Sequence, residues 1–124
     1  MKLKDNLFNI QEKNITEDAA RYAITLNSKS VIYTAHFPGH PITPGVCVIQ
    51  IVKELLEDYT GKNLSISSIS NAKFLSVIQP CEQILSVTLS KVNEENGIYS
   101  LQSIISEEDG PVYAKISLKA VVAR

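Results

Sequence analysis

The sequence predicts an α+β fold, a single domain over residues 1–124 in which a curved antiparallel sheet wraps around one long central helix. Residues 46–57 are apolar around most of a helical circumference, and a helix of this kind is expected to be buried. Most other segments alternate apolar and polar residues with a period of two, which is typical of strands. Because one helix cannot cover both faces of about five or six strands, we expect the sheet to curve around it and a dimer to bury the remaining apolar surface.

The first half of the chain contains two predicted strands, a loop and the helix. The strands are residues 6–14 and 20–27. A loop follows at residues 36–45, because three prolines and two glycines among ten residues exclude a regular helix or a central strand. Thr43 is expected to cap the helix, Pro44 to take its first position and Gly61 to end it. Gln50, Lys53, Glu54 and Glu57 form its polar stripe.

The second half of the chain is predicted to be strands. Two turn signals separate them, Asn96-Gly97 and Asp109-Gly110. Alternation is clearest where Leu85, Val87 and Leu89 share one face. The expected strands are residues 64–79, 81–92, 98–106 and 111–123, of which the first and third show the weaker patterns.

Composition excludes several classes of protein. The chain is 44% hydrophobic and 20% charged, which is typical of a globular domain and excludes a disordered chain. A formal net charge of −1 argues against a nucleic-acid binder. The sequence lacks both a membrane-spanning apolar run and the apolar core of a signal peptide, so we expect a cytoplasmic protein with no membrane partner. Two cysteines, Cys47 and Cys81, are too few for a disulfide scaffold or a zinc site, and both are expected to be structural.

The residues able to carry chemistry gather around the start of the helix. The N–H groups of its first turn have no intrahelical partner and lie at the positive end of the helix dipole. A thioester carbonyl placed there would be stabilised as it gains enolate charge, and Gly45 would let it approach closely. The imidazole of His36 could remove a proton next to that carbonyl.

Residues 36–46 read HFPGHPITPGV and resemble the signature of the beta-hydroxyacyl-[acyl-carrier-protein] dehydratases, which is roughly H-F-P-G-x-P-x-x-P-G-V. Ala72-Lys73-Phe74 followed by Pro80 is also similar to that family. The resemblance implies the hotdog fold, a dimer with sites at the subunit interface, and an acyl thioester substrate on acyl carrier protein or coenzyme A. It implies no metal and no nucleotide cofactor.

The resemblance also implies roles for single residues. His36 matches the histidine that takes the C2 proton of the 3-hydroxyacyl chain, and Gly45 matches the glycine whose N–H binds the thioester carbonyl. Phe37 is expected either to line an acyl tunnel or to pack in the core. The expected substrate-binding residues are Phe37, Pro38, Gly39, Gly45 and Val46.

One position departs from the family. Its catalytic Glu or Asp stands fourteen residues after the histidine, where this chain has Gln50. An amide can hold a hydroxyl or a water but cannot titrate near neutral pH. Family members often carry Gln four residues later, where this chain has Glu54, on the same helix face. One hypothesis is that Glu54 supplies the carboxylate while Gln50 holds the hydroxyl or orients Glu54. The alternative places Glu54 in the ordinary polar stripe.

The expected function is therefore dehydration of a 3-hydroxyacyl thioester to the trans-2-enoyl thioester, with His36, Gln50 and Glu54 as catalytic residues. The expected assembly is a dimer or a dimer of dimers. One alternative is an inert acyl-thioester-binding subunit that pairs with an active homologue in a mixed dimer. Another is a thioesterase on the same fold, which would need Glu54 to activate water.

Overall fold

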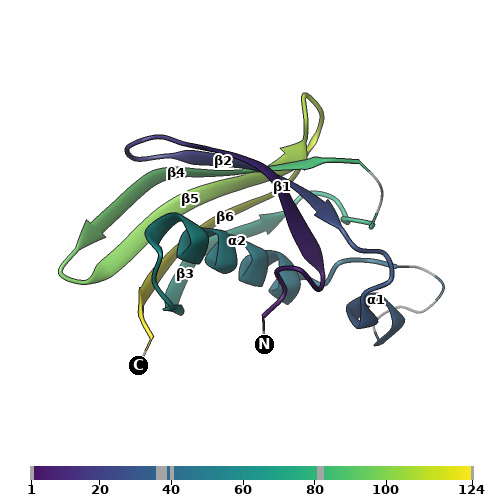
Figure 1. Ribbon diagram of the computed structural model, residues 1–124, viewed down its shortest axis with the longest axis horizontal. Helices are drawn as coiled ribbons and strands as arrows, with labels where there is room; N and C mark the ends of the chain where they lie inside the picture. The colour runs from purple at the N-terminus through teal and green to yellow at the C-terminus, as the bar shows by residue number, and fades with distance from the viewer. Residues whose placement is uncertain (1, 36–38, 40, 81–82, 124) are drawn as a thin grey trace.

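The protein is built from one six-stranded antiparallel sheet and one long helix (Figure 1). The structure, a computed structural model, describes residues 2–35, 39, 41–80 and 83–123. The strands lie in the order β1-β2-β4-β5-β6-β3. Their bounds are β1 Phe8–Ile15, β2 Ala20–Leu26, β3 Leu64–Phe74, β4 Leu85–Glu95, β5 Ile98–Glu107 and β6 Val112–Val122, and the helices are α1 Val31–Ala35 and α2 Gly45–Thr60. The predicted fold class is thus confirmed, since this is the hotdog arrangement.

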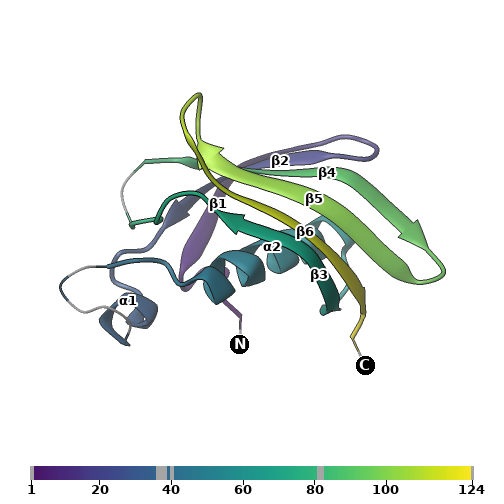
Figure 2. The ribbon, with the colours of Figure 1, turned by 180° about the vertical axis from the view of Figure 1, so that it is seen from behind.

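Helix α2 lies in the curve of the sheet, as Figure 1 and Figure 2 show from opposite sides. Its apolar side chains pack against residues from the inward face of the strands, where Leu85, Val87 and Leu89 of β4 are buried as their alternation predicts. The helix ends as expected, because Gly61 adopts a left-handed backbone with φ 72° and donates its N–H to the Glu57 carbonyl. The buried residues of α2 are Cys47, Val48, Ile51, Val52, Glu54, Leu55 and Leu56.

The start of α2 differs from the prediction. Pro44 takes the N-cap position, and no side chain among the described residues caps the helix. The Thr43 hydroxyl is instead hydrogen-bonded to the Tyr33 hydroxyl at 2.8 Å, so the expected Thr43 cap is wrong. Tyr33 belongs to α1, a five-residue helix that the sequence did not predict. One helical turn is too short to produce a recognisable period, and its local signal is the Ser30 hydroxyl, which accepts the Ile32 N–H.

Two strands differ from their predicted limits by three or more residues. Strand β3 ends at Phe74, and residues 75–80 lie outside the strands. Strand β4 extends three residues beyond the expected end, to a turn at Asn96 and Gly97 that both have positive φ. Strand β3 forms one edge of the sheet, and most of its side chains are exposed. In the part of the chain that the structure describes, no helix is long and apolar enough to cross a membrane.

Candidate functional site

Helix α2 begins at the mouth of an apolar groove. The carbonyl of Pro44 accepts the N–H groups of Cys47 and Val48, at 2.9 and 3.1 Å. Helix geometry therefore leaves the N–H groups of Gly45 and Val46 without an intrahelical carbonyl. The groove has a volume of about 620 Å³ and is lined by Ile42, Thr43, Pro44, Gly45, Val48, Phe74, Leu75, Ser76, Val77 and Ile78. The helix start that the sequence singles out thus lies beside an apolar groove.

Phe74 forms the wall of the groove opposite the helix start. A methyl group built on Gly45 would lie 3.1 Å from the Cζ atom of the Phe74 ring, which is tighter than nine in ten contacts of this kind, so the ring would have to shift slightly. Glycine at position 45 therefore lets the aromatic ring and the first turn of α2 approach each other. The sequence assigned no role to Phe74, although its place in the Ala72-Lys73-Phe74 similarity was a signal.

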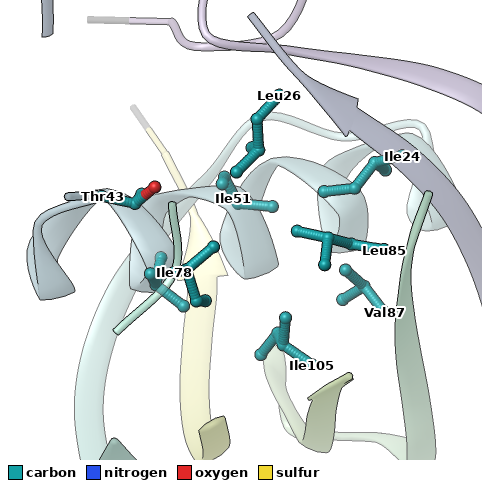
Figure 3. A pocket seen from close by; sticks show the side chains of 9 residues that line it. Ile24, Leu26, Thr43, Ile51, Ile78, Leu85, Val87 and Ile105 are labelled. Atoms are coloured by element: carbon teal, nitrogen blue, oxygen red, sulfur yellow. The ribbon is translucent and has the colours of Figure 1, made fainter. Parts of the chain in front are cut away.

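A second, narrower space lies beneath the groove, between α2 and the sheet (Figure 3). It has a volume of about 10 Å³, which is enough for one water molecule at most. Thr43, Val48 and Ile78 line both this space and the groove, so they separate the two. Figure 3 shows apolar side chains from β2, β4, β5 and α2 pointing into it.

Gln50 and Glu54 are in direct contact. The Gln50 amide donates Nε2–H to the Glu54 carboxylate at 2.8 Å. Glu54 is only 3% exposed, so its carboxylate is buried rather than on a solvated face of the helix. Its other partners come from the start of the chain, since Oε2 also accepts the Leu3 N–H and Oε1 accepts the Lys4 N–H, both at 2.8 Å.

The other predicted residues fall into two groups, those outside the described residues and those that the structure places. His36, Phe37 and Pro38, like Cys81, lie outside the described residues. Gly39 is exposed with a φ of 87°, which suits glycine. Cys47 is buried, and burial raises the pKa of its thiol, which favours the expected packing role over a reactive thiolate.

Polar groups at the far end of α2 form a separate cluster. The Tyr22 hydroxyl donates to Asp58 at 2.8 Å, and Lys13 approaches the same carboxylate at 3.1 Å. Burial raises the pKa of Asp58, but the hydrogen bonds from Tyr22 and Lys13, with the charges of Lys13 and Lys4, outweigh it and hold that pKa below its ordinary value. Among the residues described, no three His, Cys, Asp or Glu side chains are grouped to hold a metal ion.

The family model for ApeI-like proteins, described as ApeI dehydratase, matches residues 11–114. The chain belongs to the ApeI-like dehydratase family. It is 30% identical over 87 residues to the 3-hydroxyacyl-[acyl-carrier-protein] dehydratase FabZ of Ligilactobacillus salivarius, covering 64% of this chain and 61% of the relative. It is 29% identical over 109 residues to the FabZ of Geotalea uraniireducens, covering 81% of this chain and 72% of that protein. The chain therefore spans about three fifths of the length of the first of these relatives.

Solved structures agree with the fold of this ApeI-like chain. The dehydratase heterocomplex ApeI:P from Xenorhabdus doucetiae is similar with a TM-score of 0.72 at 20% identity, over 91% of this chain and 96% of that one. A hypothetical thioesterase with coenzyme A from Streptococcus pneumoniae is similar with a TM-score of 0.67 at 8% identity, over 94% and 85% of the two chains. At these identities the likeness concerns the fold alone.

Proposed function

We propose that this ApeI-like protein dehydrates a 3-hydroxyacyl thioester to the trans-2-enoyl thioester. The observation that carries the proposal is the position of Gly45, the first residue of α2, in the lining of an apolar groove, in a chain whose loop carries the dehydratase signature. The thioester carbonyl would accept these N–H groups while the acyl chain lies along Phe74 and Val77. His36 would remove the C2 proton, and the helix start would stabilise the enolate oxygen.

Loss of the hydroxyl group completes the reaction. The electron pair of the enolate forms the C2–C3 double bond, and the C3–O bond breaks to release water. The Gln50 amide would hold the departing hydroxyl, and Glu54 would hold that amide in place through the hydrogen bond between them. The hydroxyl leaves with the proton that His36 took from C2, because an amide has no titratable proton near neutral pH.

A dimer would complete the groove. Strand β3 ends the sheet with an unpaired edge, and its neighbourhood carries exposed apolar side chains, among them Ile69, Phe74, Leu75 and Val77. An edge of this kind is a template for pairing with a second strand. A second copy, or a homologue in a mixed dimer, would cover it. The substrate would be carried by acyl carrier protein or coenzyme A, in fatty-acid-type or related lipid or polyene biosynthesis, in the cytoplasm.

A specific observation favours a second candidate, an inert acyl-thioester-binding subunit of a mixed complex. The family's carboxylate position holds Gln50, and the nearest helix carboxylate, Glu54, has both oxygens engaged by N–H donors. One fold neighbour, the ApeI:P assembly, is a dehydratase heterocomplex. This chain would then supply binding surface while a partner supplies the acid.

The test is a turnover assay on 3-hydroxyacyl and 2-enoyl thioesters, with wild type compared with His36→Ala and with the exposed-residue control Lys29→Ala. Dehydration predicts reversible water loss by wild type and the control, and a loss of roughly 100-fold or more in His36→Ala. Equal activity in His36→Ala would refute the assignment. Tight binding without turnover, alone and with a homologue, would indicate the inert subunit, whereas release of free thiol would indicate a thioesterase.

A further inference from the structure

Glu54 is hydrogen-bonded both to the beginning of the chain and to Gln50, the residue at the family's catalytic position. Its carboxylate accepts three hydrogen bonds of 2.8 Å, from the Leu3 N–H, the Lys4 N–H and the Gln50 amide. The side chain is almost fully buried. We infer that Glu54 is a positioning residue, which clamps residues 2–7 onto α2 and by the same carboxylate fixes the Gln50 amide beside the substrate.

The segment that donates to Glu54 is itself held firmly. Leu3 and Leu7 are 1% and 0% exposed, so both side chains are part of the core. The Leu3 carbonyl accepts the Leu7 N–H at 2.7 Å, which closes a turn, and the Leu7 carbonyl accepts the Asn27 N–H at 2.7 Å. This turn presents the N–H groups of Leu3 and Lys4 to α2. Buried N–H groups require acceptors, and Glu54 provides one for each.

The hydrogen bonds of Glu54 explain why this chain has an amide at position 50 and an acid at position 54, the reverse of the family's order. Three donors converge on residue 54, and a carboxylate can accept at both oxygens, whereas the family's Gln would turn an NH₂ group towards one of them. A carboxylate at position 50 would lack the amide N–H that donates to Glu54. An amide at position 50 instead donates to Glu54. The exchange therefore follows from the clamp, and it makes residues 2–7 part of the support of the site.

The clamp is tested by amide hydrogen exchange on the full chain, a readout that does not depend on activity. In wild type, the Leu3 and Lys4 amides are expected to be protected. Glu54→Gln should accelerate their exchange by about tenfold or more and shift the NMR signal of the Gln50 side-chain amide. Glu57→Gln is the matched control, because Glu57 accepts the Leu64 N–H at 2.8 Å one turn away. It should affect Leu64 and leave Leu3 and Lys4 unchanged. Unprotected Leu3 and Lys4 amides in wild type would overturn the clamp.

The positioning role rests on the proposed function and is tested by a double-mutant cycle in kcat. Glu54→Gln should lower kcat about tenfold with little change in KM, and it should have no further effect in a Gln50→Ala background. Independent, additive effects of the two substitutions would refute positioning through Gln50. Absence of turnover in wild type would refute the proposed function. The amide exchange of Leu3 and Lys4 and the NMR signal of Gln50 would still test whether Glu54 clamps the segment and fixes the amide.

Discussion

At the residue scale, two close contacts define the site. Gly45 lets the Phe74 ring pack against the start of α2, and Glu54 gathers three donors that include the amide of Gln50. The Phe74 ring thus limits the size of residue 45, and the N–H donors around residue 54 favour a carboxylate there. A side chain at position 45 would displace the ring, and a neutral residue at position 54 would leave a buried N–H without an acceptor.

The Gly45 contact predicts a loss of function without a loss of stability. Alanine favours a helix over glycine by about 1 kcal/mol, so Gly45→Ala should not destabilise the fold. Its methyl group would push the Phe74 ring away and disturb the groove, and we expect kcat/KM to fall by about tenfold or more. Steady-state kinetics and thermal unfolding measure the two effects. In the double variant Gly45→Ala/Phe74→Leu, part of the activity should return, and unchanged kinetics in the single variant would contradict the contact.

The Asp58 cluster predicts a pH-dependent stability. The folded pKa of Asp58 lies below that of an unfolded aspartate, about 3.9. Its stabilisation is therefore fully present above about pH 5 and is lost as the pH falls through the folded pKa. Asp58→Asn should cost about 1–3 kcal/mol of unfolding free energy at pH 7 and almost nothing near pH 2. Urea unfolding at both pH values measures this, with exposed Glu95→Gln as the control. A difference that persists undiminished at low pH would contradict the assignment.

At the element scale, the parts that were predictable from the sequence are those with local signals. The period of two in β4 and β6, the Asn96-Gly97 turn and the Gly61 helix end all depend on neighbouring residues, and the structure confirms them. The burial of Glu54 could not be predicted, because its partners Leu3 and Lys4 lie 51 and 50 residues away. The Thr43 cap was wrong because the Thr43 hydroxyl is bonded instead to the hydroxyl of Tyr33, ten residues earlier in the chain.

The exposed edge at β3 predicts how subunits associate. Ile69 and Ile104 are 44% and 39% exposed, but Ile69 lies on edge strand β3 and Ile104 on inner strand β5. Ile69→Lys would place a charge in the proposed β3 interface, and we expect the proposed dimer to dissociate at micromolar concentration. Ile104→Lys should leave the molecular mass unchanged. Sedimentation analysis measures the molecular mass of both variants. An unchanged mass in Ile69→Lys would contradict association through this edge.

At the scale of the whole molecule, the sheet holds α2 so that its two ends have different roles. The first turn faces the groove, whereas Asp58 in the last turn is fixed by Tyr22 and Lys13. Gln50 and Glu54 lie between these ends and connect the helix to the start of the chain. The motif of residues 36–46 made the family predictable, but the long-range contacts around Gln50 and Glu54 required the structure.

The most direct test of the central claim, proton removal beside a carbonyl held at the start of α2, is deuterium incorporation at C2 of a 3-hydroxyacyl thioester in D₂O. Proton exchange requires the base and the enolate but not loss of water, so it separates His36 from Gln50. We expect incorporation by wild type, none above background in His36→Ala, and retention in Gln50→Ala. No incorporation by the wild-type protein, or equal incorporation in His36→Ala, would contradict this chemistry.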